Sequence, residues 1–202
     1  KNKNYLPLIV TNLRLLTLTI KTIKYIINME ETKPKTGKYA LTYGLILGAI
    51  SVVFIFMLYS LDMHYQGGPM VMGISLIITI AMIVIGMMQF KKDNNGFMSF
   101  GEGLKIGVGI GLIAGIIGII FNQILAGVID PEMMNKAMEY QKGMLMETTK
   151  MTPDQIDAQM EMGKKFTTPS WQIIFGLIYS IVASLILSLI PALILKKKET
   201  IQ

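Results

Sequence analysis

Four long apolar runs dominate the chain, and each is long enough to cross a bilayer. They extend over about residues 39–61, 70–90, 104–129 and 171–195, and their central turns contain no charged residue. A membrane-spanning helix needs about 20 mostly apolar residues, whereas a helix of a soluble domain shows a polar face at 3.6-residue spacing. The pattern therefore predicts an all-α, polytopic membrane protein built on a bundle of four transmembrane helices.

The polar segment between the third and fourth runs, residues 130–170, carries helix start signals. Asp130 is followed by a proline, which is a typical N-cap with proline at the first helical position. The sequence TPDQ, residues 152–155, has the form of a capping box. These signals predict two helices, about 131–149 and 153–165, that form a helical hairpin between the third and fourth transmembrane helices.

Methionine is concentrated in the same segment, which holds eight of the 17 methionines in the chain. Thioethers can bind Cu(I), but neither histidine nor cysteine accompanies these methionines. Methionine is also an adaptable apolar filler. We therefore expect no metal site and no cofactor here, and we expect the methionines to pack the hairpin or to offer an adaptable surface to a partner.

Glycine recurs at four-residue intervals in the third run and so forms one stripe along a helix. Small residues at this spacing let transmembrane helices approach closely, and the first and fourth runs carry comparable stripes. We expect the first, third and fourth helices to pack along these stripes and the second, which has no such stripe, to be more peripheral. The alternative is that the glycines line a substrate path or form a hinge. The residues expected to mediate helix packing are Gly44, Gly48, Gly103, Gly107, Gly111, Gly115, Gly176, Ser180, Ser184 and Ser188.

Ionisable and amide side chains inside a membrane are candidates for function, and the four runs contain few of them. Glu102 and Lys105 are three residues apart at the start of the third run. A boundary ion pair is the simplest interpretation of both. Asn122 and Gln123 lie deeper in the same run, where their amide groups can hydrogen bond across helices as structural contacts.

Candidate catalytic chemistry is sparse elsewhere as well. The chain has no cysteine and a single histidine, His64, which follows Asp62 in the loop after the first run. One histidine beside one aspartate, without an obvious nucleophile, is weak evidence for catalysis, so we interpret both as residues of a solvated loop. Phosphate-binding loops, zinc-ligand spacings and serine-hydrolase elbows are absent from the sequence. We therefore expect no enzymatic activity.

Lysines flank the apolar runs unevenly, and this predicts the orientation. The loop 62–69 contains no Lys or Arg, and long segments such as 130–170 translocate regardless of charge. By the positive-inside rule both termini are cytoplasmic, and the loop and the helical hairpin are extracytoplasmic. The lysines that set this orientation are Lys33, Lys35, Lys38, Lys91, Lys92, Lys105, Lys196, Lys197 and Lys198.

The net charge of +6 comes mainly from residues 1–28, which contain five basic and no acidic residues. No basic patch is left for a folded domain, so we expect no nucleic-acid partner. Residues 1–28 are either an artefactual upstream extension or a basic amphipathic helix that lies in the membrane interface. The membrane domain is then 29–198, and residues 199–202 are a cytoplasmic tail.

Several stretches together resemble one known family. These are KYALTYGLILGAISV, FMSFGEGLKIGVGIGLIAG, the long segment DPEMM…TPDQIDAQMEMGKKFTTPSW and the final KKK. They resemble the DUF4199 family, which comprises small four-span membrane proteins of Bacteroidota with no assigned function. The resemblance covers about residues 29–198 and implies a bacterial inner membrane. It implies no catalytic residues.

Two candidate functions from different classes remain. The first is a non-enzymatic scaffold that binds the lipid bilayer and another membrane protein or a second copy of itself. The alternative is a small transporter or channel component that acts as an oligomer. A cavity that reaches the midplane and is lined by Asn122, Gln123 or Ser184 would favour transport. A solid bundle with an exposed apolar stripe would favour partner binding.

Overall fold

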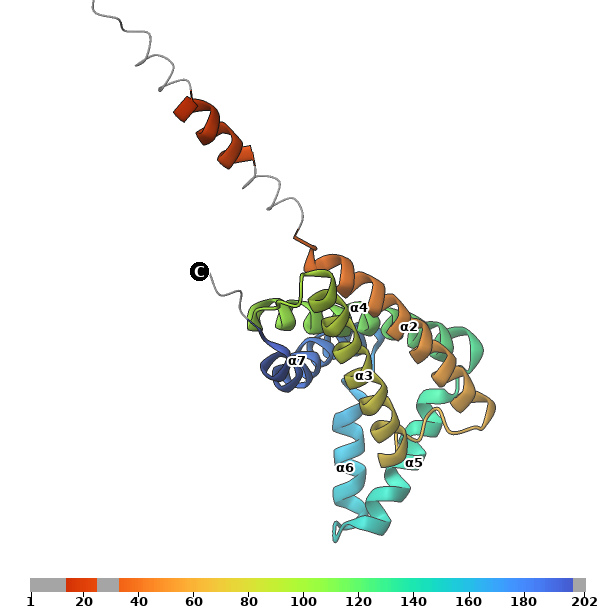
Figure 1. Cartoon of the computed structure of the whole chain (residues 1–202). Helices are drawn as coiled ribbons and strands as arrows, with labels where there is room; N and C mark the ends of the chain where they lie inside the picture. Colours follow the sequence, from red (N-terminus) through yellow and green to blue (C-terminus); the bar gives the residue numbers. More distant parts are fainter. Residues whose placement is uncertain (1–13, 25–32, 198–202) are drawn as a thin grey trace, which may run out of the picture. The chain divides into compact units, whose positions relative to one another are not determined.

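The computed structural model describes residues 14–24 and 33–197, and nearly all regular structure within them is helical. Four helices are long and apolar enough to cross a membrane, which confirms the predicted all-α membrane fold (Figure 1). They match the predicted apolar runs to within a few residues. The four are α2 (Thr36–Ser60), α3 (Pro69–Asp93), α4 (Phe100–Ile124), which continues into the π-helical turn η1 (Leu125–Ile129), and α7 (Pro169–Leu195).

The chain divides into two compact units, Lys1–Lys35 and Thr36–Gln202. In the first unit, residues 14–24 are helical, and the apolar side chains of this helix, such as Leu16 and Ile20, are exposed. An exposed helix of this kind is compatible with either interpretation of the N-terminal extension. The predictions for residues 1–13 and 25–28 and for the tail 199–202 lie outside the described residues.

Local sequence accounts for where the helices begin. Ser99 caps α4 in a capping box, in which its hydroxyl accepts from the backbone N–H of Glu102 while the Glu102 carboxylate accepts from the backbone N–H of Ser99. Proline occupies the first turn of α3 and α7, where its missing N–H costs no hydrogen bond. Gly96 adopts a φ of 83° in the turn between α3 and α4, a conformation that glycine accepts without steric cost.

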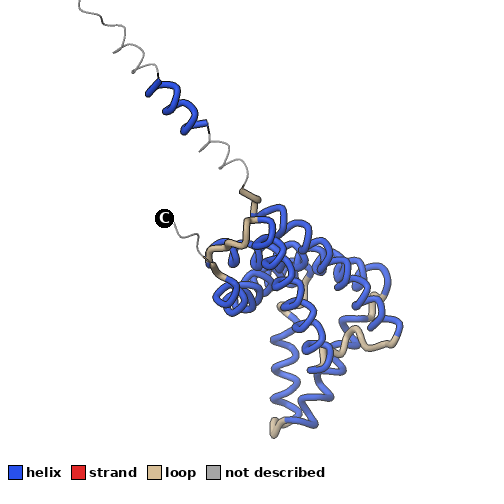
Figure 2. Tube along the Cα trace, in the orientation of Figure 1, coloured by secondary structure: helices blue, strands red, loops and turns tan. Residues whose placement is uncertain are grey.

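Helix α4 is the centre of the bundle, because it makes extensive contacts with α2 and with α7. Helix α3 contacts all three of the other spanning helices, less extensively (Figures 1 and 2). This agrees with the expectation that the second span is more peripheral than the others, but the last part of α3 is an exception. Its side chains Ile83, Met87 and Phe90 are almost completely buried and pack in the same core as Ile106 and Ile110 of α4.

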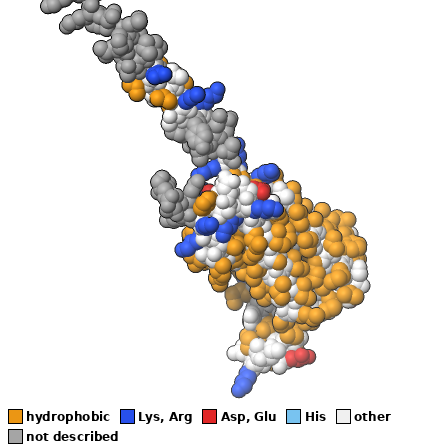
Figure 3. Space-filling model, viewed as in Figure 1, with side chains coloured by type: hydrophobic (Ala, Val, Ile, Leu, Met, Phe, Trp, Pro, Cys, Tyr) orange, Lys and Arg blue, Asp and Glu red, His pale blue; other side chains and the backbone are white. Residues whose placement is uncertain are grey.

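One end of the bundle is held together by polar contacts, and we call it the lysine-rich end. Tyr39 donates a hydrogen bond of 2.6 Å to Asp93, which joins the start of α2 to the end of α3. Lys197, two residues beyond the end of α7, forms a two-bond antiparallel bridge with Met98. Lys91 Nζ donates to the carbonyl oxygen of Leu195 over 2.8 Å. Figure 3 shows lysine side chains gathered here and hydrophobic side chains over the adjoining side of the bundle.

The opposite end, which we call the hairpin end, carries α5 (Met133–Thr148) and α6 (Pro153–Lys164). These two helices pack against each other, and an ion pair joins Lys142 to Asp157. The predicted capping box at the start of α6 is present, with Thr152 and Gln155 bonded to each other's backbone N–H. Whether this end lies outside the cytoplasm stays a prediction.

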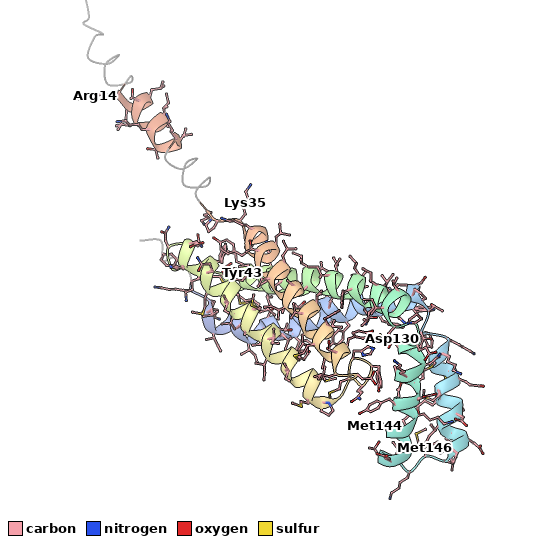
Figure 4. All side chains as sticks on the ribbon, turned by 90° about the vertical axis from the view of Figure 1, so that its right-hand side faces the viewer. Arg14, Lys35, Tyr43, Asp130, Met144 and Met146 are labelled. Atoms are coloured by element: carbon pink, nitrogen blue, oxygen red, sulfur yellow. The ribbon has the colours of Figure 1, made fainter. Side chains whose placement is uncertain are left out.

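Two details of the hairpin differ from the sequence interpretation. Helix α5 begins at Met133, and its N-cap position is Glu132 rather than Asp130, whose side chain is engaged elsewhere. The methionines do not all pack the hairpin, since Met144 and Met146 near the far end of α5 are 39% and 50% exposed, which leaves the alternative of an adaptable surface open (Figure 4).

Candidate functional site

The glycine stripe of α4 faces α7 in antiparallel register. A Cβ atom added to any of its four glycines would collide with a small residue of α7, and at Gly107 it would lie 2.7 Å from the Cβ of Ser188. The backbones are therefore too close for any larger residue, as expected for small residues between transmembrane helices. The facing pairs are Gly103 with Ala192, Gly107 with Ser188, Gly111 with Ser184, and Gly115 with Ser180.

The serine hydroxyls of this ladder do not bridge the two helices. Ser184 Oγ donates to the carbonyl oxygen of Ser180 over 2.6 Å, and Ser188 Oγ donates to that of Ser184. Both serines are nearly completely buried. Because each donor is satisfied within α7, the contact between α4 and α7 depends on close packing rather than on interhelical hydrogen bonds.

The glycines of α2 are used differently, because they accept large side chains from α4. The added Cβ of Gly44 would lie 2.8 Å from the Cβ of Ile113, and that of Gly48 would collide with Ile117. Gly176 of α7 accepts a third isoleucine in the same way, Ile119 of α4. The three helices thus meet at the expected glycines. Ile113 and Ile117 of α4 pack on the glycines of α2, whereas Ile119 continues the line of the glycine stripe and packs on α7.

The polar residues of α4 fall into two separate places. Glu102 bonds to Ser99 in the capping box described above, so the expected ion pair with Lys105 is replaced by an N-cap. At the hairpin end, Gln123 Nε2 donates to Gln172 Oε1 of α7 over 3.0 Å, which is a hydrogen bond across helices. Within the described residues Asn122 makes no side-chain hydrogen bond and faces a cavity instead.

That cavity, which we call the α3–α7 groove, opens on the surface of the bundle and has a volume of about 580 Å³. The first half of α3 and the first two thirds of α7 form its walls, α4 forms its floor, and α2 contributes at one edge. No Asp, Glu, Lys, Arg or His of the described chain lines it. Its polar lining consists of Ser51, Ser75, Thr79, Asn122, Gln123, Gln172, Tyr179, Ser180 and Ser184.

Sequence reasoning identifies the floor of the groove but misses its α3 wall. Asn122, Gln123 and Ser184 are among the expected residues, whereas Ser75 and Thr79 of α3 are not. Their four-residue spacing is the available signal, since it places two small polar residues on one side of the second apolar run. In the part of the chain that the structure describes, nothing lies within 4 Å of a Cβ added to Gly118 at the floor, so this glycine leaves open space.

A second cluster of polar residues joins the loop after α2 to the hairpin. His64 Nε2 lies 3.0 Å from Asp130 Oδ2, and Lys136 Nζ of α5 lies 3.0 Å from the same oxygen. Edge-on rings of Tyr59 and Tyr65 enclose the imidazole. In Figure 4, Asp130 lies where the bundle passes into α5.

The environment of this cluster overturns the interpretation of His64 as a solvated residue. Its side chain is only 1% exposed, and its buried Nδ1 atom has no hydrogen-bond partner among the described residues. The Lys136 ammonium donates to the Asp130 carboxylate and lowers the pKa of that carboxyl group, against the opposing effect of burial; the bond from His64 lowers it further. The same contact raises the pKa of Lys136.

The described residues do not bring the candidate acid–base groups together. Glu102 lies in the first turn of α4, whereas the partners of His64 lie beyond its last turn. No group of three or more His, Cys, Asp or Glu side chains suited to a metal ion occurs in the described part of the chain.

The fold and the groove define a multi-pass α-helical membrane protein with an uncharged cavity between its spanning helices. A family model described as "Protein of unknown function (DUF4199)" matches residues 42–197. The chain therefore belongs to the DUF4199 family, as the sequence resemblance indicated. No match was found among curated proteins or among solved structures.

Proposed function

We propose that this protein is a non-enzymatic binding protein of the bacterial inner membrane and that it holds another membrane component in the α3–α7 groove. The observation that carries the proposal is a cavity of about 580 Å³ between spanning helices, with no charged side chain in its lining. Ligand sites in proteins are typically cavities of about 300–1,000 Å³ with mostly apolar walls and a few polar groups. The groove has these properties.

The proposed orientation places both termini in the cytoplasm. Its support is the clustering of Lys91, Lys92, Lys105 and Lys197 near the lysine-rich end, where the ends of α3 and α7 meet the start of α4. The positive-inside rule associates such clusters with the cytoplasmic side.

Transport is the second candidate, and one observation favours it over a purely structural scaffold. The groove reaches Gly111 and Ser184, near the middle of their helices, and Asn122, Gln123 and Ser184 all line it. However, the groove ends at the core of Ile83, Met87, Ile106 and Ile110, which are fully buried. A closed core on one side favours binding over passage through a single copy. Transport by an oligomer would require a path between subunits.

Photocrosslinking from inside the groove tests the binding function. A photoreactive amino acid at Ser75, which lines the groove, is compared with the same residue at Ile77, which is 68% exposed on the same helix and does not line it. In native membranes we expect a discrete adduct from position 75 and only bulk lipid labelling from position 77. Identical, non-specific labelling from both positions would contradict the proposal.

A further inference from the structure

We infer that the component held in the α3–α7 groove is a lipid amphiphile with an uncharged head group. This inference rests on the proposed binding function and narrows it from any membrane component to one chemical class. Three properties of the groove support it: its depth along the bundle, the state of its hydroxyl groups and the position of its amides.

The depth of the groove corresponds to one leaflet. Its lining on α4 extends from Gly111 to Gln123, which at 1.5 Å per residue is about 18 Å. The hydrocarbon core of a bilayer is about 30 Å thick, so the groove covers little more than half of it, on the side of the hairpin end. A transmembrane helix of a partner would cross the whole thickness, whereas an acyl chain ends near the midplane. The depth therefore favours a lipid.

The inner part of the groove offers no free hydrogen-bond donor from its serine and threonine side chains. Ser75 and Thr79 of α3 donate to the carbonyl oxygens of Val71 and Ser75, each over 2.8 Å. Ser180 and Ser184 of α7 donate to carbonyl oxygens of α7 in the same way. Since these hydroxyls are already satisfied, the serine and threonine side chains of the inner walls can face hydrocarbon without an unpaired donor.

The amide groups gather at the mouth of the groove, near the hairpin end. Gln123 and Gln172 are bonded to each other, and Asn122 is left with both donors and its acceptor available. An amide offers hydrogen bonds of both kinds but no net charge, and no ionisable acid or base lines the groove. A head group held here is therefore recognised through hydroxyl, ester or amide groups. A charged phosphate would find no counter-ion in the lining.

Two photoactivatable lipids distinguish these properties. The full chain is placed in nanodiscs with diacylglycerol or phosphatidylglycerol carrying the same diazirine-labelled acyl chain, and labelled peptides are mapped by mass spectrometry. We expect diacylglycerol to label the groove segments 71–79 and 172–187 several-fold more efficiently than phosphatidylglycerol. Asn122→Leu should reduce this preference while leaving total labelling of the groove in place.

Variants that fill the groove show whether the label is inside it. Ser75→Trp and, as a second filling variant, Thr79→Phe should reduce labelling of these segments by diacylglycerol to the background of the exposed surface. Ile77→Trp, the matched control on α3, should leave labelling unchanged. Equal labelling by both lipids, a preference for phosphatidylglycerol, or undiminished labelling of both filled variants would overturn the inference. If any of these results came together with a discrete protein adduct from position 75 in native membranes, the binding function would stand, and only the assignment of a lipid as the bound component would be wrong.

Discussion

The packing of α4 against α7 makes a quantitative prediction at Gly107. The perturbation is Gly107→Ala, which adds one methyl group between the helices. The new Cβ would lie 2.7 Å from Ser188 Cβ, closer still to Ser188 Oγ, and 3.1 Å from Met87 Cε. Ordinary contact begins at 3.4 Å. The methionine end can move aside, but Ser188 is part of a helix, so α4 and α7 must separate.

The magnitude follows from two opposing effects. Overpacking by a methylene-sized group in a close-packed interior costs about 1–3 kcal/mol. Alanine is favoured over glycine in a helix by up to about 1 kcal/mol in water, and this gain reduces the net effect. We therefore expect Gly107→Ala to lower the free energy of unfolding by roughly 1–2 kcal/mol. The matched control is Gly118→Ala on the same helix, where an added Cβ meets nothing within 4 Å, and it should be neutral or stabilising.

The assay is reversible unfolding of the purified full chain in mixed micelles, with helix content followed as SDS is increased. A double variant completes it. Ser188→Gly removes the colliding atoms, so Gly107→Ala should lower the free energy of unfolding by less in that background than in the original chain. The coupling free energy of the two substitutions should approach the free energy lost to the collision. If Gly107→Ala unfolds like Gly118→Ala, or if Ser188→Gly gives no rescue, the ladder is not the contact between α4 and α7.

Three further predictions concern other parts of the molecule. Asp130→Asn should lower the melting temperature at neutral pH. Lys136 and His64 hold the pKa of the Asp130 carboxyl group below 3.8, so the stability that the carboxylate contributes is present above pH 3.8 and is lost as the pH falls through the lowered pKa. The melting temperatures of the original chain and the variant should therefore converge at low pH in a pH series. Ser99→Ala should cost about 0.5–2 kcal/mol of stability through loss of the α4 N-cap, whereas Ser170→Ala, at an exposed position of α7, should not, as measured by the same SDS titration. Reporter enzymes fused to either terminus should both indicate the cytoplasm, and opposite compartments would contradict the proposed orientation.

The sequence predicts those parts of the fold that depend on the bilayer or on local hydrogen bonds. The four spans are predictable because a backbone in hydrocarbon must satisfy its polar groups within a helix. The capping box from Thr152 to Gln155 is predictable because its two partners are three residues apart. The glycine stripe predicts which face of α4 allows another helix to approach closely, and the structure places α7 against that face.

Features that depend on distant residues are not predictable in this way. Asp130 has the sequence signature of a helix cap, but its actual partners, His64 and Lys136, come from a loop and a helix that only the folded chain brings together. The burial of His64 follows from the same arrangement. The α3–α7 groove arises because α3 packs tightly in its second half and less tightly in its first, a difference that no apolar pattern within α3 records.

The antiparallel ladder between α4 and α7 also has a consequence for biosynthesis. Helix α4 leaves the ribosome well before its partner, since residues 130–168 separate the two helices. At about 5–20 residues per second, those 39 residues alone take roughly 2–8 seconds. Until those residues have been made, α7 is not available to cover the glycine face of α4. Helix α7 is the last of the four spanning helices to be synthesised. The bundle therefore stays incomplete for seconds, until α7 inserts and packs its serine face against α4.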